Sequence, residues 1–394
     1  MQDLFKMSPV FQFQLPRKVI FGNEAAARVG EEARAAFGGR TVLLISDRGV
    51  KAAGLTQGVE ASLAAAGYRV VLYDQVAPDA PLSRVLECAA LGRREKADVV
   101  VGLGGGSTID TAKAVSFMVP WSGDIREQLG NNQVTVEGLP KVFIPTTAGT
   151  GSELSHTFVL YDDTNHVKLT SYSPRTFADL AIIDPTLTLN LPPRVTAESG
   201  VDAFSHALES YVTVKANPLS ELLSLRGVEM IARHLRRAYT AGPSDLEARY
   251  AMCFGVSMGT MAIRSSGVGA IHATCYPPAA RHQLSHGVAI ALLMPAVMRY
   301  NLTANPAKYA AVAEVMGEDL QGLSQEEAAQ AAVSAVSRLI ADVGLPTRLR
   351  EVGVKREDFP GFAATVLGNY PHHIANNPRP AGLEDLVAIY ESAY

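Results

Sequence analysis

The stretch Val99–Lys113 reads VVVGLGGGSTIDTAK and decides the fold of the first half of the chain. It begins with a run of apolar residues, which is typical of a strand buried on both faces. The residues Gly104, Gly105, Gly106 and Ser107 then lead into a segment with helical spacing. Glycine lets a backbone approach a ligand closely, and a helix N-terminus presents unpaired N–H groups to a phosphate. The loop either binds a pyrophosphate or is an ordinary tight turn, because it lacks the G-x-G-x-x-G dinucleotide fingerprint.

The same alternation of strand and helix continues on both sides of this stretch. Strands are predicted over Thr41–Ser46, Arg69–Asp74, Ala97–Leu103, Lys141–Pro145 and Leu180–Asp184. Helices are predicted between them, over Ala25–Phe37, Val50–Ala66, Leu82–Glu95 and Thr108–Phe117. Such alternation indicates right-handed βαβ units and a parallel sheet. Residues 1–190 are therefore predicted to form a Rossmann-like, nucleotide-binding α/β domain.

After Asp184 the strand patterns stop and long amphipathic segments begin. Helices are predicted over Ala197–Val214, Leu219–Tyr239, Asp245–Ile263, His286–Asn301, Gln325–Val343 and Leu383–Ala393. Pro, Gly and Asn separate them, so residues 191–394 are predicted to form an all-helical domain.

Composition excludes several classes of protein. Of the 394 residues, 47% are hydrophobic and 19% are charged, and the net charge is −4 with no basic cluster for nucleic acid. The three cysteines form no CxxC pair, which argues against a disulfide framework or a thiolate zinc site. The N-terminus lacks the apolar run of a signal peptide, and the apolar stretch Val288–Val297 is too short to span a bilayer. We expect a cytoplasmic protein without a membrane or nucleic-acid partner.

A second loop rich in glycine and threonine follows the strand Lys141–Pro145. It belongs to the stretch IPTTAGTGSE (residues 144–153), in which the hydroxyls of Thr146, Thr147 and Ser152 are candidates to bond phosphate or ribose. Serine and threonine also fill many ordinary turns. Ligands bind at the carboxyl ends of parallel strands, however, and both loops are predicted to lie there.

Asp47 ends another predicted strand at the same edge. A carboxylate there accepts from a ribose 2′-hydroxyl and repels a 2′-phosphate, which favours NAD over NADP. The alternative is that Asp47 serves as a turn or helix cap, and the adjacent Arg48 leaves room for a phosphate.

Four residues of the second half have the chemistry of a metal site. Asp202 and His206 are four residues apart in a predicted helix and so share one face. His272 and His286 follow, and Pro277-Pro278 is expected to bend or end the helix between them, because proline cannot continue its hydrogen bonds. One carboxylate and three neutral imidazoles suit Fe²⁺ or Zn²⁺. The alternative for Asp202 and His206 alone is an ion pair in a helix interface.

Together these motifs resemble the iron-containing (group III) alcohol dehydrogenase family over nearly the whole chain. The similar stretches are GGGSTIDTAK (104–113), PTTAGTGSE (145–153), GVDAFSH (200–206), SHGVA (285–289) and NPRP (377–380). The resemblance implies a dehydroquinate synthase-like architecture, with a nucleotide-binding domain followed by a helical domain. It implies metal ligation by Asp202, His206, His272 and His286. It also implies cofactor contacts at Asp47, Gly105, Gly106, Ser107, Asp110, Thr146, Thr147 and Lys168.

The sequence departs from the family pattern at the substrate end. Tyr276 stands where the family commonly has a second histidine beside the nicotinamide and the substrate. His372 and His373 occupy a stretch that lines the family's substrate channel, where a histidine that carries charge near neutral pH would suit a substrate with a polar or anionic tail. Both histidines could equally be surface loop residues after Pro371. Tyr276 and His373 are the candidates to relay a proton.

The predicted function is a metal-dependent, NAD(H)-linked alcohol dehydrogenase or aldehyde reductase. Hydride passes between nicotinamide C4 and a small primary alcohol or aldehyde, with Fe²⁺ favoured and Zn²⁺ open. The alternatives are a metal-free maleylacetate-type reductase, a hydroxyacid or polyol dehydrogenase with the same site, and a non-catalytic nucleotide-binding protein. The resemblance also implies a homodimer or a larger homo-oligomer.

Overall fold

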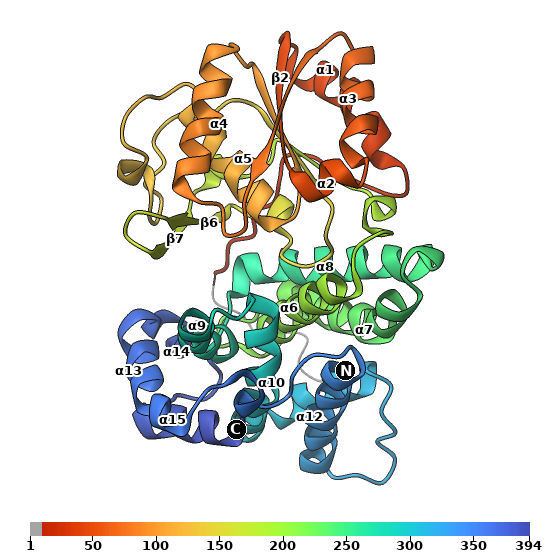
Figure 1. The fold of residues 1–394 in the computed structure, drawn as a ribbon. Coiled ribbons are helices and arrows are strands. Elements are labelled where there is room, and N and C mark those ends of the chain that lie inside the picture. The colour runs from red at the N-terminus through yellow and green to blue at the C-terminus, as the bar shows by residue number, and fades with distance from the viewer. Residues whose placement is uncertain (1–9) are drawn as a thin grey trace. The chain divides into compact units, whose positions relative to one another are not determined.

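The computed structural model describes residues 10–394, which form two compact units (Figure 1). One unit is Leu15–Asn190, and the other comprises Leu191–Tyr394 together with residues 10–14. The predicted combination of an α/β domain and a helical domain is confirmed.

The α/β unit is built on a six-stranded parallel sheet with the order β1-β8-β5-β4-β2-β3. Its strands are β1 (Val19–Phe21), β2 (Thr41–Asp47), β3 (Arg69–Val76), β4 (Val99–Gly104), β5 (Lys141–Pro145) and β8 (Leu180–Ile183). The helices are α1 (Val29–Phe37), α2 (Arg48–Ala52), α3 (Leu55–Ala65), α4 (Leu82–Arg94) and α5 (Gly106–Met118). The five predicted strands are all present.

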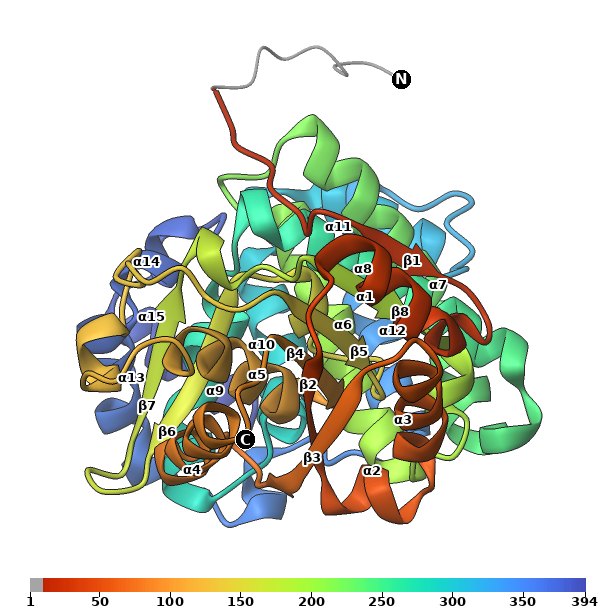
Figure 2. The same ribbon diagram turned by 90° about the horizontal axis from the view of Figure 1, so that it is seen from above.

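Helices cover both faces of this sheet (Figures 1 and 2). Val42 and Leu44 of β2 belong to a buried cluster with residues of α1 and α3, such as Val29 and Leu63. The intervening Leu43 points the other way, since a Cβ at Gly92 of α4 would lie 3.0 Å from it. Because alternate side chains of a strand point to opposite faces, an uninterrupted apolar run such as β2 requires this double cover.

Three strands were not predicted. The short β1 pairs parallel to β8, and β6 (Thr157–Asp162) pairs antiparallel with β7 (Val167–Tyr172) in a separate hairpin. Val167, Lys168 and Thr170 of β7 are exposed, so the hairpin lacks the apolar run by which the other strands are recognised.

Among the described residues of the second unit there are helices and no strand. They are α6 (Pro193–Val212), α7 (Pro218–Ala241), α8 (Leu246–Ser266), α9 (Ala270–His282), α10 (His286–Asn301), α11 (Pro306–Val315), α12 (Gln325–Asp342), α13 (Phe359–Asn369), α14 (Pro371–Asn376) and α15 (Leu383–Ser392). The stretch His286–Ala304 has the length and hydropathy of a membrane span, but 67% of its apolar window is buried, as in a core helix of this unit.

Pro277-Pro278 was predicted to bend or end a helix, and the part of this prediction that ends the helix is wrong. Helix α9 continues through both prolines to His282. Pro278 has no N–H for the Thr274 carbonyl, and the Tyr390 hydroxyl donates to that oxygen instead, at 2.8 Å. The chain turns at Gln283, whose φ of 53° is left-handed. The expected result still holds: His272 lies near the start of α9 and His286 at the start of α10.

Candidate functional site

Asp202 and His206 lie one turn apart on helix α6, and the Asp202 Oδ1 atom is 3.7 Å from His206 Nε2. Asp202 is only 4% exposed. Burial lowers the pKa of His206 to about 4, so its imidazole is neutral at neutral pH. Burial acts to raise the pKa of Asp202, but His206 and the neighbouring histidines lower it by more, so the carboxylate is ionised. The pair therefore has the protonation state of metal ligands.

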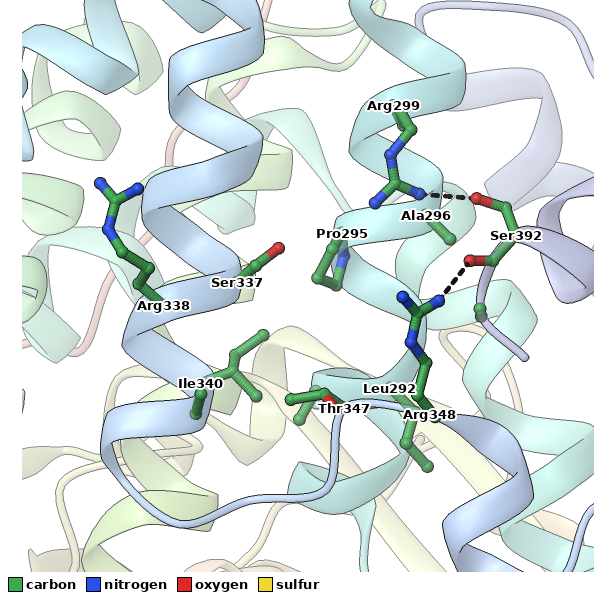
Figure 3. A pocket seen from close by; sticks show the side chains of 13 residues that line it. Leu292, Pro295, Ala296, Arg299, Ser337, Arg338, Ile340, Thr347, Arg348 and Ser392 are labelled. Carbon is green, nitrogen blue, oxygen red and sulfur yellow. Dashed lines mark hydrogen bonds between the residues drawn. The ribbon is translucent and has the colours of Figure 1, made fainter.

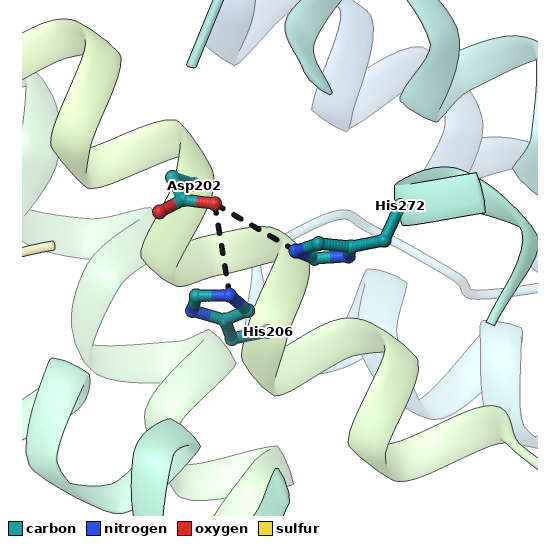
Figure 4. Close-up of side chains that lie close together, drawn as sticks. All are labelled: Asp202, His206 and His272. Carbon is teal, nitrogen blue, oxygen red and sulfur yellow. Dashed lines mark ion pairs between the residues drawn. The ribbon is translucent and has the colours of Figure 1, made fainter. Parts of the chain in front are cut away.

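Two further imidazoles converge on the same carboxylate oxygen. His272 Nε2 is 3.8 Å and His286 Nε2 is 3.4 Å from Asp202 Oδ1. Figure 4 shows how Asp202 and His206 of α6 face His272 of α9. The ligand atoms of these three residues lie within 4.8 Å of one another. His286 is outside that set and its side chain is 38% exposed, so it occupies the open side of the cluster.

The hydrogen bonding of this cluster fits a cation. Asp202 Oδ1 and His272 Nε2 are buried and have no hydrogen-bond partner. His272 Nδ1 lies 2.5 Å from the Glu209 carboxylate, which as an acceptor places the ring proton on Nδ1 and a lone pair on Nε2. Two lone pairs then face each other in a buried space. A tetrahedral ion with ligand bonds of about 2.1 Å would separate its ligand atoms by about 3.4 Å, close to the observed distances.

The two glycine-containing loops of the α/β unit lie against each other. Gly105 is the N-cap of α5 and provides no side-chain cap, so the first N–H groups of this 13-residue helix have no side-chain acceptor from the cap residue. A Cβ at Gly104 would lie 2.5 Å from Thr108, and one at Gly106 would lie 3.0 Å from Thr150. The Thr146 N–H donates to the Gly104 carbonyl at 3.0 Å. The packing of the loops therefore requires the glycines whether or not a phosphate binds.

Asp110 and Ser152 are joined to each other in a buried network. The Ser152 hydroxyl donates to Asp110 Oδ1 at 2.5 Å, and the Val159 N–H donates to Oδ2 at 2.9 Å. Lys113, whose side chain is fully buried, donates to the Ser152 hydroxyl at 2.6 Å. These contacts join helix α5 to the second loop, so both predicted cofactor residues have a structural role here.

The remaining predicted cofactor residues lie near the same strand ends or on the hairpin. Asp47 caps α2 by accepting from the Val50 N–H at 2.9 Å, and its other oxygen is 3.3 Å from the Thr108 hydroxyl. Asp47 therefore serves as a helix cap, as the alternative interpretation of the sequence proposed, and its side chain is half-buried. Ser107 accepts from the Asp79 N–H at 3.1 Å, and Thr147 is half-buried. Lys168 is exposed on β7 and pairs with Asp79 at 2.7 Å.

Comparison with known proteins decides the family. Residues 16–185 match the family described as "Iron-containing alcohol dehydrogenase", and residues 196–394 match the "Fe-containing alcohol dehydrogenase family, C-terminal". The chain belongs to the iron-containing alcohol dehydrogenase family. The predicted class of activity, an alcohol dehydrogenase or aldehyde reductase acting on a small molecule, is confirmed, and NAD(H) and a divalent metal are typical of this family.

Individual relatives cover almost the whole chain. The 1,3-propanediol dehydrogenase of Klebsiella pneumoniae is 36% identical over 387 residues, which are 98% of this chain and 99% of the relative. The lactaldehyde reductase of Escherichia coli (strain K12) is 35% identical over 376 residues, 95% of this chain and 97% of the relative. The crystal structure of a 1,3-propanediol oxidoreductase superposes with a TM-score of 0.94 at 36% identity, covering 98% of this chain and 100% of that one.

The two residues that depart from the family pattern lie beside the histidine cluster. The Tyr276 ring stacks on His286 at a centroid distance of 5.8 Å, and His373 lies 6.3 Å from Tyr276. His372 is exposed and His373 is half-buried, and both belong to helix α14, so the surface-loop alternative is wrong for His373. The expectation that His373 carries charge near neutral pH is also wrong, because burial lowers its pKa to about 3. Its Nδ1 atom is buried and has no hydrogen-bond partner.

Sequence reasoning missed Glu209, which contacts His272. The spacing of residues could have identified it, because Asp202, His206 and Glu209 are at positions i, i+4 and i+7 of α6 and so share one face. Glu209 lies outside the family stretch GVDAFSH (200–206), so the motif did not include it.

A separate pocket of about 330 Å³ contains none of the predicted site residues (Figure 3). It lies among residues of α10, α12 and α15. Arg299 and Arg348 donate to the hydroxyl and the carbonyl of Ser392, at the C-terminal end of α15. This arrangement is that of basic groups capping a helix C-terminus.

Proposed function

We propose that this iron-type alcohol dehydrogenase interconverts a short primary alcohol and its aldehyde with NAD(H), using a divalent metal held by Asp202, His206, His272 and His286. The observation that carries the proposal is the convergence of three imidazole Nε2 atoms on Asp202 Oδ1 at 3.4–3.8 Å. Both Asp202 Oδ1 and His272 Nε2 are buried and have no hydrogen-bond partner. Fe²⁺ is the favoured ion by family, and Zn²⁺ has the same ligand preference.

A bound divalent metal supplies Lewis acidity, which lowers the pKa of an alcohol and polarises a carbonyl. The side chains around the metal site position the substrate. His286, the most exposed of the four, and the stacked Tyr276 line the open side of the cluster, where the substrate has access. The neutral imidazole of His373 lies 6.3 Å from the Tyr276 ring, measured between ring centroids. We assign Tyr276 and His373 to substrate contact and proton relay.

We assign NAD(H) to the α/β unit, with its pyrophosphate at the N-terminus of α5. The uncapped turn at Gly105, Gly106 and Ser107 and the hydroxyls of Thr146 and Thr147 support this assignment. Asp47 is proposed to favour NAD over NADP through its charge. Asp110 and Ser152 are proposed to hold helix α5 against the second loop rather than to contact the cofactor directly.

The relatives named above act on, or are named for, small molecules with a second oxygen, 1,3-propanediol and lactaldehyde. We therefore propose a short substrate with a polar group distant from the reacting carbon, which keeps a polyol within its range. The complete metal cluster argues against a metal-free reductase. A homodimer or larger homo-oligomer and a cytoplasmic location are proposed from family resemblance.

The test is the metal content and activity of His272→Ala. We expect this variant to lose tight metal binding and turnover together, because the site then loses a buried ligand. Elemental analysis of the purified proteins, followed by assay with NADH and a panel of short aldehydes, measures both. His234→Ala is the matched control, since His234 lies on α7 and bonds the Met230 carbonyl. Normal metal content and turnover in His272→Ala would contradict the proposal.

A further inference from the structure

Glu209 occupies a buried position directly behind a proposed metal ligand. It is 2% exposed, on helix α6, and one of its oxygens lies 2.5 Å from His272 Nδ1. Its other oxygen accepts from the Ile271 N–H at 2.7 Å. Both oxygens thus accept hydrogen bonds from the first turn of α9, which contains His272.

This first turn of α9 has no cap of its own. The N-cap residue is Gly269, which has no side chain, and the Ala270 N–H reaches only the Asn377 side chain, at 3.3 Å. A Cβ at Gly269 would lie 3.2 Å from the Glu209 oxygen and 3.3 Å from that of Asn377. Glycine at this position therefore lets two distant side chains approach the helix end.

The contact with His272 also fixes which ring nitrogen carries the proton. A carboxylate only accepts, so Nδ1 must donate and Nε2 keeps its lone pair. That nitrogen is the one that faces Asp202 Oδ1 at 3.8 Å. An amide at position 209 has a single oxygen, so it can either keep the bond from the Ile271 N–H and turn its N–H₂ group to Nδ1, or turn the oxygen to Nδ1 and lose the Ile271 bond. In the first case the proton moves to Nε2 and blocks ligation.

We propose that Glu209 is a positioning residue that holds His272 in the tautomer and orientation required to bind the metal. This inference rests on the proposed function, because it presumes that His272 is a ligand. Groups behind a metal-bound histidine commonly set its tautomer, and removing one typically lowers metal affinity by about 10–100-fold.

The experiment compares Glu209→Gln with Asn377→Ala in the full chain. Each variant is stripped of metal, and its affinity for Zn²⁺ is measured by competition with a chromogenic chelator. The thermal unfolding midpoint without metal is measured alongside. Glu209→Gln is expected to lose about 10–100-fold in Zn²⁺ affinity. Asn377→Ala weakens the same helix start without touching the ring, and is expected to lower the unfolding midpoint but to bind Zn²⁺ within about threefold of wild type.

Two results would overturn the inference: wild-type Zn²⁺ affinity in Glu209→Gln, or an equal loss in Asn377→Ala, which would make the role merely structural. If Glu209→Gln does not fold, ¹⁵N-histidine NMR of the metal-free wild type decides. A proton on His272 Nδ1 supports the role of Glu209, and a proton on Nε2 contradicts it. The proposed function is tested separately: normal metal content and turnover in His272→Ala would contradict it.

Discussion

At the scale of single residues, the charged side chains of this chain serve structure and chemistry together. Asp47 caps α2 and also lies at the strand end where a ribose is expected. Asp110 and Lys113 of α5 bind Ser152 of the second loop, although they belong to a motif that resembles a cofactor site. Glu153, in the second loop, is buried, and its burial raises its pKa to about 7. Residues of a shared motif therefore have structural roles of their own in this chain.

Asp47→Asn separates the two roles of Asp47. Asparagine keeps the cap and the side-chain volume but removes the charge. We expect the preference for NAD over NADP to narrow by about tenfold, or about 1–2 kcal/mol, since this carboxylate is partly solvated. The ratio of kcat/KM for the two cofactors measures the effect. Glu31→Gln, at an exposed position of α1, is the control and should leave the ratio unchanged. Equal use of both cofactors by the wild type would refute the role.

Variants of Tyr276 and His373 test whether these residues contact the substrate. Tyr276→His should shift the chain-length preference, because it replaces a stacked ring beside His286 with a smaller one. His373→Ala should raise KM more than it lowers kcat. Because the pKa of His373 is about 3, that effect should be constant between about pH 6 and 8. The exposed neighbour supplies the control variant, His372→Ala. An unchanged substrate profile in both Tyr276→His and His373→Ala would show that neither lines the pocket.

At the scale of elements, local sequence patterns predicted the long helices well, but they did not predict that α9 continues through its two prolines. Two prolines within 13 residues predict a break, yet a side chain from α15 satisfies one of the carbonyls that they leave free. Helices α11, α13 and α14 were missed. Of these, α13 carries Pro and Gly, and α14 has only six residues. Elements that depend on tertiary partners are the ones that propensity predicts least.

The bond between Tyr390 and Thr274 can be tested by a double-mutant cycle. Tyr390→Phe leaves a buried carbonyl without a donor and should lower the free energy of unfolding by about 1–3 kcal/mol. In the Pro278→Ala background residue 278 regains an N–H for the same carbonyl, so Tyr390→Phe should cost less there. Urea denaturation of the four proteins measures the coupling. Strictly additive effects would mean that Pro278 does not explain the Tyr390 contact.

At the scale of the whole molecule, the two units carry different halves of the chemistry. The proposed metal ligands come from α6, α9 and α10, and the proposed NAD(H) contacts come from the strand ends of the sheet and the start of α5. Each ligand should therefore stabilise mainly the unit that binds it.

Hydrogen exchange can detect this division. Adding Zn²⁺ to metal-free protein should slow exchange in α6, α9 and α10, and adding NADH should slow it around the N-terminus of α5. At a free ligand concentration 100 times its Kd, the stabilisation is about 2.7 kcal/mol. His272→Ala should lose the response to Zn²⁺ and keep the response to NADH. Protection of α5 alone by Zn²⁺ would contradict the assignment of the metal to the helical unit.

The sequence by itself determined the alternation of strands and helices, the glycine loops at strand ends, and the residue types of the metal cluster. These features follow from hydrophobic periodicity and local backbone chemistry, which neighbouring residues encode. Only the tertiary structure decided that His272 and His286 converge on Asp202, that Glu209 lies behind His272, and that Tyr390 supports α9. Those contacts join residues as far as 116 positions apart. They depend on how helices pack, and packing is set by many side chains at once rather than by any local pattern.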